Sequence, residues 1–548
     1  MINGLSGTMM DYQLTLTPIM KRAMQLYPNK EIRTKFGDTM HKVTYAESYR
    51  RCGQLAQALK KLGIEDGDRV GTFAWNTYRH HELYFGVPCM GAVVHTLNLR
   101  LPADQLIFII NHAEDKVIFV DDTLIKLLEP LAPQLKTVKH YIVMTHGELP
   151  ETSLPNVHSY EELLAAESGD YGWPEIDENA AAAMCYTSGT TGHPKGVLYS
   201  HRAIYLHTMM VSLTDAMGLA EPDILMPVVP MFHAMAWGLV YAGTMVGCTL
   251  IYPGPHMQGA DLAGLIQDEK ITVTAGVPTL WLGLLQVLEA GDYNISSLQR
   301  MPVGGSAAPR SMIKAYKEKF GVDILHAWGM TEMTPVGTLS AIKSHMADWS
   351  DEAKLDLRAK QGITPPGVEM RIMDVNGEEL PWDGEAMGEL QVRGPAVTAD
   401  YYKDERSADS FTEDGWFRTG DVSSIDSEGY MQIVDRTKDL VKSGGEWIST
   451  VELENAIMGH EDVMEAAVIA IPHPKWQERP LACVVVSDGA DKAQVKAGIY
   501  DLLSKEFAKW QLPDDIEFIA EVPKTSVGKF DKKVLRKQYE GYQIAETE

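Results

Sequence analysis

The sequence predicts an α/β protein in which helices cover largely parallel sheets, and three observations support this. Helical and strand-like patterns alternate along the N-terminal part of the chain, as expected for α/β layers. The 548 residues exceed what a single hydrophobic core supports, so the chain should divide into several packed units. Its 45% hydrophobic and 23% charged residues are typical of a globular protein.

The individual elements follow from local patterns. Thr44 and Glu47 have the spacing of a capping box, and apolar residues recur after them at helical spacing as far as Gly63. Alternation and apolar runs then predict a strand, a helix and two further strands, over residues 69–75, 78–90, 116–120 and 180–185. Residues 426–430 are typical of a turn between short strands.

Residues 224–260 contain no Asp, Glu, Lys or Arg, and such a span is long enough to cross a membrane. Four prolines and several glycines interrupt it, however, and these break a continuous helix. We therefore expect a buried strand followed by a helix beside an apolar pocket.

Charge and cysteine usage restrict the partners and the compartment. The net charge of −26 opposes nonspecific binding to nucleic acid or anionic membranes. The five cysteines are scattered, with no C-x-x-C pair, which favours a reduced protein over a disulfide framework or a zinc site. No targeting segment is recognisable, so the expected location is the cytoplasm, without membrane insertion.

One segment points to phosphate binding: Tyr186-Thr187-Ser188-Gly189-Thr190-Thr191-Gly192-His193-Pro194-Lys195-Gly196. Its glycines let backbone N–H groups turn toward an anion, its hydroxyls add donors, and Lys195 supplies a positive charge. Loose Gly/Ser stretches are mostly surface turns. The pattern also differs from a P-loop, because two residues separate Gly192 from Lys195.

Five further segments with chemically useful side chains follow in order: Gly304-Gly305-Ser306-Ala307-Ala308-Pro309, His326-Ala327-Trp328-Gly329-Met330-Thr331-Glu332, Thr419-Gly420-Asp421, Asp435-Arg436-Thr437-Lys438-Asp439 with Lys442-Ser443-Gly444-Gly445-Glu446-Trp447, and Pro523-Lys524-Thr525-Ser526-Val527-Gly528-Lys529. Taken singly, a lysine or glutamate is usually a solvated side chain and a tryptophan usually belongs to the core.

Together these segments resemble the motifs of the acyl-adenylate-forming superfamily, which includes acyl-CoA synthetases, adenylation domains and luciferases. The resemblance extends over nearly the whole chain. It implies a large N-terminal domain of layered α/β sheets, residues 1–437, with the ATP and acyl pockets. It also implies a small, mobile α+β C-terminal domain, residues 438–548, that acts as a lid and carries the catalytic Lys529.

The resemblance also implies roles for individual residues. ATP or AMP would contact Thr187, Ser188, Gly189, Thr190, Thr191, Gly192, Lys195, Gly304, Gly305, Ser306, Ala307, Trp328, Gly329, Met330, Thr331, Asp421 and Arg436. Asp421 would accept the ribose hydroxyls, and Trp328 would stack on adenine where relatives usually have Tyr. Thr190 and Glu332 would hold Mg²⁺.

Catalysis would depend on Lys529, Glu332, Thr331 and His233, with Lys529 stabilising charge at the α-phosphate and carboxylate. Lys438 would be the hinge about which the small domain rotates after adenylation. CoA, the co-substrate, would then meet Ser443, Gly444, Gly445, Glu446 and Trp447.

The acyl pocket would be formed by Met231, His233, Met235 and Trp237. Amino-acid-activating relatives place an Asp in this region, and residues 230–238 contain no acid, so an uncharged acyl chain is expected. The bulk of Trp237 favours a short or medium chain, and the methionines suit irregular substrates. Residues 442–449 resemble bacterial medium-chain acyl-CoA ligases and, more closely, 3-methylmercaptopropionate-CoA ligases of dimethylsulfoniopropionate breakdown.

The resulting hypothesis is an ATP-dependent acyl-CoA ligase. Carboxylate and ATP give acyl-AMP and pyrophosphate, and CoA then gives acyl-CoA and AMP. Two alternatives remain open: a ligase that loads a carrier protein, and a noncatalytic nucleotide-binding protein. A homodimer also stays open.

Overall fold

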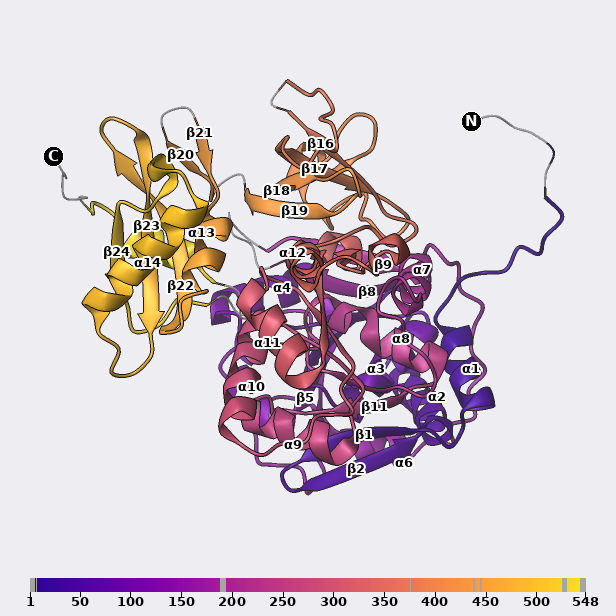
Figure 1. Ribbon diagram of the computed structural model, residues 1–548. Helices are drawn as coiled ribbons and strands as arrows, with labels where there is room; N and C mark the ends of the chain where they lie inside the picture. Colours follow the sequence, from indigo (N-terminus) through magenta and orange to yellow (C-terminus); the bar gives the residue numbers. More distant parts are fainter. Residues whose placement is uncertain are drawn as a thin grey trace.

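A computed structural model describes residues 5, 7–187, 194–374, 376–436, 439–443, 446–524 and 530–542. In this part of the chain four sheets are formed. Two large sheets with their helices make the body of the molecule, and a smaller antiparallel sheet and the C-terminal unit lie on one side of it (Figure 1). The predicted α/β class is therefore confirmed, as is the division into a large N-terminal and a smaller C-terminal domain.

The seven-stranded sheet is parallel except at one edge. Its strands, in spatial order, are β7 (Val157–Ser159), β6 (His140–Met144), β5 (Asp115–Asp121), β3 (Arg69–Phe73), β4 (Val93–Thr96), β8 (Ala181–Tyr186) and β9 (Gly196–Ser200). The helices of this region are α1 (Thr17–Leu26), α2 (Tyr45–Lys61), α3 (Tyr78–Cys89), α4 (Ala103–Ala113), α5 (Ile125–Leu128), α6 (Tyr160–Ala165) and α7 (His201–Ser212).

The eight-stranded sheet has a parallel centre and an antiparallel strand at each edge. Its order is β15 (Val336–Leu339), β14 (Asp323–Gly329), β13 (Arg300–Val303), β12 (Val273–Ala275), β10 (Ile224–Pro227), β11 (Thr249–Tyr252), β1 (Glu31–Phe36) and β2 (Thr39–Thr44). Its helices are α8 (Leu239–Val246), α9 (Gly259–Glu269), α10 (Pro278–Ala290), α11 (Arg310–Phe320) and α12 (Asp351–Ala359).

The two remaining sheets are smaller. The antiparallel one has the order β16 (Glu369–Met373), β17 (Gly388–Arg393), β18 (Phe417–Ile425) and β19 (Met431–Arg436). The C-terminal sheet has β21 (Glu446–Ile448), β20 (Val441–Ser443), β23 (Gln477–Val486) and β22 (Val463–His473), with β24 (Asp515–Phe518) also paired to β23. Its helices are α13 (Thr450–Ile457), α14 (Lys492–Glu506) and α15 (Lys532–Gln538).

The elements predicted from local patterns are present with small shifts at their ends. Thr44 caps α2 by accepting a hydrogen bond from the Glu47 N–H at 3.1 Å. The uncharged 224–260 segment forms β10, a short 3-10 helix, α8 and β11. No helix among the described residues is long and apolar enough to span a membrane. The predicted turn at 426–430 joins β18 and β19.

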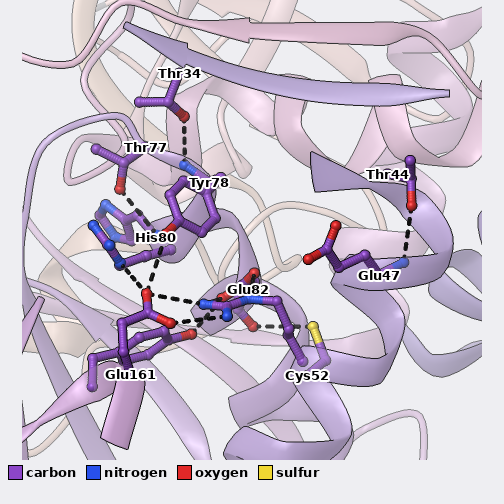
Figure 2. A network of polar contacts seen from close by, with 12 residues as sticks. Thr34, Thr44, Glu47, Cys52, Thr77, Tyr78, His80, Glu82 and Glu161 are labelled. Atoms are coloured by element: carbon purple, nitrogen blue, oxygen red, sulfur yellow. Dashed lines mark hydrogen bonds and ion pairs between the residues drawn. The ribbon is translucent and has the colours of Figure 1, made fainter. Parts of the chain in front are cut away.

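A buried polar network joins three helices of the N-terminal region (Figure 2). Arg51 of α2 forms ion pairs with Glu82 of α3 at 2.6 Å and with Glu161 of α6 at 2.9 Å. Arg79 also contacts Glu161 at 2.7 Å. Burial alone would raise the pKa of Glu161, but the two arginines outweigh it and lower that pKa to about 2. Breaking the buried Arg51–Glu82 pair by removing one partner costs about 3–5 kcal/mol, so this pair fixes the packing of α2 on α3.

Candidate active site

A cavity of about 410 Å³ opens where strands of both large sheets end. It lies at the carboxyl ends of β8, β13 and β14, which is where open α/β sheets bind ligands. Residues from the antiparallel sheet complete its wall. The described lining residues are Thr187, Lys195, His233, Ala234, Trp237, Gly304, Gly305, Ala327, Trp328, Gly329, Met330, Thr331, Glu332, Pro335, Val336, Tyr401, Arg406, Ser410, Phe417, Arg418, Thr419, Gly420 and Arg436.

The predicted phosphate loop begins and ends at this cavity. The Thr187 N–H donates to the Lys195 carbonyl at 2.9 Å, and the Lys195 N–H donates to the Thr187 hydroxyl at 3.2 Å. The Lys195 ammonium lies 4.2 Å from the centre of the Tyr401 ring and 3.5 Å from the Ser410 hydroxyl. A positive charge is thus held on the wall. The predicted contacts Ser188, Gly189, Thr190, Thr191 and Gly192 lie outside the described residues.

The turn after β13 lies against the end of β14, and it requires glycine. A Cβ at Gly304 would come within 2.8 Å of the Ala327 carbonyl oxygen, and one at Gly329 within 2.2 Å of the Pro335 carbonyl oxygen. Real Cβ atoms do not approach backbone so closely, so the two glycines allow the strands and loops to meet at the cavity. Ser306 and Ala307 belong to the same turn and are half-buried.

His326 fastens this turn to β14. Its Nε2 accepts a hydrogen bond from the Ala308 N–H at 3.1 Å, and its Nδ1 lies 2.9 Å from the Ala359 carbonyl oxygen. Burial lowers the pKa of His326 to about 4. The ring is therefore neutral near pH 7, with Nδ1 as donor and Nε2 as acceptor, and its role here is to position the turn.

Asp421, the predicted ribose contact, is hydrogen-bonded to Trp328, the predicted adenine contact. The Trp328 indole N–H donates to Asp421 Oδ2 at 2.9 Å, and the Arg436 guanidinium approaches Oδ1 at 3.2 Å. Asp421 is 4% exposed. Asp421 and Arg436 are also paired across β18 and β19. Each carboxylate oxygen keeps acceptor capacity beyond one protein contact, so binding of hydroxyl groups remains chemically available.

Glu332 is held firmly at the cavity wall. The Tyr401 hydroxyl donates to Glu332 Oε1 at 2.7 Å, and the Thr398 N–H donates to the Glu332 carbonyl at 2.7 Å. The neighbouring Thr331 carbonyl accepts from the Tyr199 hydroxyl at 2.6 Å. Glu332 is 7% exposed and lines the cavity. These bonds fix a carboxylate in the cavity that Thr187 and Lys195 also line.

Another part of the cavity lining comes from a segment with an unusual backbone. The residues of the short 3-10 helix, Ala234–Gly238, all have positive φ, from 42° to 75°. His233 and Trp237 line the cavity, whereas Met231 and Met235 are buried in the core cluster that spans the large domain. Gly238 of this left-handed turn packs closely against His207: a Cβ added at Gly238 would lie 2.7 Å from His207 Nδ1. The turn thereby fixes Trp237 in the wall.

The C-terminal domain contributes less to the described part of the site. Ser443 is buried, and its hydroxyl oxygen accepts a hydrogen bond from Arg479 at 3.0 Å. Lys438, Gly444, Gly445 and Lys529 lie outside the described residues, as do the side chains of Glu446 and Trp447. The hinge, the CoA contacts and the catalytic lysine therefore stay predictions.

A family model described as AMP-binding enzyme matches residues 20–402, and one described as AMP-binding enzyme C-terminal domain matches residues 452–529. The chain belongs to the AMP-binding enzyme family. It is an enzyme that uses ATP, of the acid–thiol ligase type found in this family.

Curated relatives of this AMP-binding enzyme include three bacterial ligases. A long-chain-fatty-acid–CoA ligase of Thermus thermophilus is 49% identical and covers 99% of this chain and 98% of its own length. A medium-chain-fatty-acid–CoA ligase of Ectopseudomonas oleovorans is 43% identical, with 97% coverage of both chains. A 3-methylmercaptopropionyl-CoA ligase of Ruegeria lacuscaerulensis is 42% identical and covers 97% and 98%.

Solved structures agree with the fold over almost the full length. An anthranilate CoA ligase in complex with anthranoyl-AMP superposes with a TM-score of 0.87 at 25% identity, covering 96% of this chain and 98% of that one. ATP-bound MatB from Rhodopseudomonas palustris gives a TM-score of 0.82 at 27% identity, covering 97% and 100%.

The sequence motifs did not identify several residues that line the cavity of this AMP-binding enzyme. Tyr401, Arg406 and Ser410 line the cavity, and Tyr401 and Ser410 lie next to Lys195, but they stand in no motif, and only the fold brings them there. Arg418 directly precedes the Thr419-Gly420-Asp421 motif. Its place beside this motif, which holds the predicted ribose contact, could have identified Arg418 from the sequence.

Proposed function

We propose that this ligase activates a carboxylic acid whose acyl chain is uncharged and of short or medium length, such as 3-methylmercaptopropionate, and transfers the acyl group to CoA. The acid's carboxylate oxygen attacks the α-phosphate of ATP and pyrophosphate leaves. The CoA thiol then attacks the carbonyl carbon of acyl-AMP, and AMP leaves. The first step converts a poor leaving group into a good one, which is why the reaction consumes ATP.

The observation that carries this proposal is that both cationic and apolar side chains line one cavity. Lys195, Arg406, Arg418 and Arg436 supply positive charge, as polyphosphate requires. Ala234, Trp237 and Val336 supply apolar surface, called the acyl side below. Glu332 is the one carboxylate among the described lining residues, so the acyl side contains no acid to pair with a substrate ammonium group.

The position of Trp237 in the cavity wall limits the length of the acyl chain. Trp237 is 6% exposed, and its ring end lies 3.4 Å from the position of a Cβ on Gly304. The indole therefore closes the space between the acyl side and the turn after β13. A cavity of about 410 Å³ is in the range for one drug-sized ligand, so an acyl-adenylate leaves little room for a long chain. The long-chain name of the Thermus relative supports the competing possibility, a longer acid.

The residue roles belong to the same proposal. Trp328 would stack on adenine while its N–H holds Asp421 for the ribose hydroxyls. Lys195 would bind the polyphosphate, Lys529 the α-phosphate and the substrate carboxylate, and His233 the carboxylate from the acyl side. Lys438 would be the hinge at the boundary between residues 1–437 and 438–548.

Glu332 is a residue of this site that could bind a magnesium ion. Its carboxylate is a hard oxygen ligand in the cavity that Lys195 also lines, and Thr190 of the phosphate loop is the predicted second contact. The described residues contain no group of three His, Cys, Asp or Glu that could hold a metal ion, so phosphate oxygens and water would complete the coordination. When bound, the ion neutralises charge on the phosphate oxygens.

The expected location remains the cytoplasm, because the five cysteines are free and buried, as in a reduced protein.

The test is release of AMP and pyrophosphate with ATP and Mg²⁺, with and without CoA. The acids would be straight chains of about two to sixteen carbons, 3-methylmercaptopropionate, benzoate and amino acids. CoA-dependent AMP release that peaks at short or medium acids is expected. A peak at the longest acids would reject the chain-length proposal, and pyrophosphate release that CoA does not accelerate would favour another acceptor such as a carrier protein.

A further inference from the structure

The two domains are joined by a polar cluster rather than by a shared apolar core. Among the described residues, each buried hydrophobic cluster lies wholly within one domain. Helix α13 at the edge of the C-terminal domain faces the antiparallel sheet of the large domain (Figure 1), and it packs on β19. The contacts between α13 and β19 therefore hold much of the domain orientation.

Asp435 at the end of β19 is the centre of this contact. Its Oδ2 accepts hydrogen bonds from the Thr450 N–H at 2.8 Å and from the Thr450 hydroxyl at 2.5 Å. Ser449, which caps α13, donates its hydroxyl to the Val434 carbonyl at 2.5 Å. Asp435 is 2% exposed. Since both donors of Thr450 converge on one buried carboxylate, these bonds are of the strong, charge-assisted kind.

A buried lysine supports the cluster from the C-terminal side. The Lys532 ammonium of α15 lies 2.7 Å from Glu454 Oε1 and donates to the Thr450 hydroxyl. Burial alone would lower the pKa of Lys532, but attraction to Glu454 and Asp435 outweighs it and raises that pKa. Lys532 therefore stays charged and stabilises Asp435 across the domain boundary.

Asp435 and Thr450 lie on opposite sides of residues 437–438, where the chain passes between the domains. The predicted rotation of the C-terminal domain after adenylation would carry α13 away from β19 and break both bonds to Asp435. We propose that Asp435 and Thr450, backed by Lys532 and Glu454, form a latch that holds one of the two working orientations of the C-terminal domain. The latch thereby sets the balance between acyl-adenylate formation and thioester formation. This inference rests on the two-step reaction proposed above.

The chain offers a variant that opens the latch without disturbing the helix. Thr450 is the first residue of α13, and the preceding Ser449 is extended, with φ −73° and ψ 119°. Proline is favoured at this helix position and after such a residue. Thr450→Pro removes the N–H and the hydroxyl together, whereas the control Thr450→Ser keeps both donors to Asp435.

The two half-reactions are measured separately. Adenylation is followed by exchange of pyrophosphate into ATP with hexanoate, and thioester formation by mixing preformed hexanoyl-AMP with CoA. We expect Thr450→Pro to change the ratio of the two rates by about tenfold or more, because the loss of even one of the two charge-assisted hydrogen bonds has about that effect. One half-reaction slows while the other is unchanged or faster. Thr450→Ser keeps the wild-type ratio.

The ratio of the half-reaction rates, the distribution of distances between the domains and the melting temperature together decide the outcome. A fluorescence energy-transfer pair with one dye on each domain should report a changed distribution of distances in Thr450→Pro, at an unchanged melting temperature. Equal loss in both half-reactions, or an unchanged ratio together with an unchanged distribution, would overturn the latch. Absence of both half-reactions in the wild-type enzyme would instead reject the proposed function.

Discussion

Replacing Tyr401 by Phe tests whether the cavity wall positions Glu332 for adenylation. The substitution removes the hydroxyl that donates to Glu332 at 2.7 Å, and it keeps the ring on which Lys195 rests at 4.2 Å. A hydrogen bond to a charged group contributes about 1.5–3 kcal/mol. Since each 1.36 kcal/mol is tenfold in rate, kcat/KM for ATP should fall by about 10- to 100-fold.

The assay is initial-rate pyrophosphate release at several ATP and Mg²⁺ concentrations, and we expect the Mg²⁺ requirement to rise. Thioester formation from preformed acyl-AMP should change little, because that step does not use the polyphosphate. Tyr402→Phe is the matched control, since the Tyr402 ring packs against His112, with 5.5 Å between ring centres, outside the cavity lining. The reasoning is refuted if Tyr401→Phe stays within about twofold of wild type, or if both half-reactions fall equally.

Three further predictions concern the catalytic lysine, the acyl wall and a buried carboxyl group. Lys529→Ala should reduce adenylation by at least about 100-fold and largely spare thioester formation from acyl-AMP; equal losses in the two half-reaction assays would argue against its role. Trp237→Gly should move the preference toward longer acids without straining the backbone, because Trp237 has φ 56° and glycine tolerates that value; an unchanged chain-length profile would disprove the gate. Burial raises the pKa of Asp121 to about 7, so the folded state holds this proton more tightly than the unfolded state. Its contribution to stability is full below the unfolded pKa and is lost as pH rises through about 7. Asp121→Asn keeps an acceptor for the Trp75 N–H, which lies 2.7 Å from Asp121; melting temperatures from pH 5 to 8.5 should fall less steeply for the variant, and parallel curves would contradict the assignment.

Local patterns predicted the elements well where one physical cause acts over a few residues. The Thr44 cap and the turn at 426–430 are examples, because their hydrogen bonds form within four residues of sequence. The order of strands in the two large sheets could not be obtained in this way. It depends on pairings such as β1 with β11, more than two hundred residues apart in the chain, which leave no mark on local periodicity.

The left-handed turn from Ala234 to Gly238 shows where the same reasoning fails. Of its five residues only Gly238 favours positive φ, so the sequence predicted an ordinary buried segment. The surrounding core imposes the turn, and it separates residues that the sequence treats alike: His233 and Trp237 line the cavity, whereas Met231 and Met235 are buried in the core.

For the site, motifs located residues but not their contacts. Trp328 and Asp421 were assigned to different parts of the nucleotide, and the structure adds a direct hydrogen bond between them. Tyr401 was missed because it acts on Glu332 from a segment without a motif. The latch between Asp435 and Thr450 was likewise hidden, since only the packing of α13 on β19 brings these residues together.

The central claim is that the acid passes through an acyl-adenylate, and isotope transfer tests it directly. The enzyme would convert hexanoate labelled with ¹⁸O in its carboxylate, with ATP and CoA, and the phosphorus-containing products would be analysed by mass spectrometry. Attack of the carboxylate on the α-phosphate predicts one ¹⁸O atom in AMP and none in pyrophosphate. Unlabelled AMP, with the label in another phosphate product, would contradict the account.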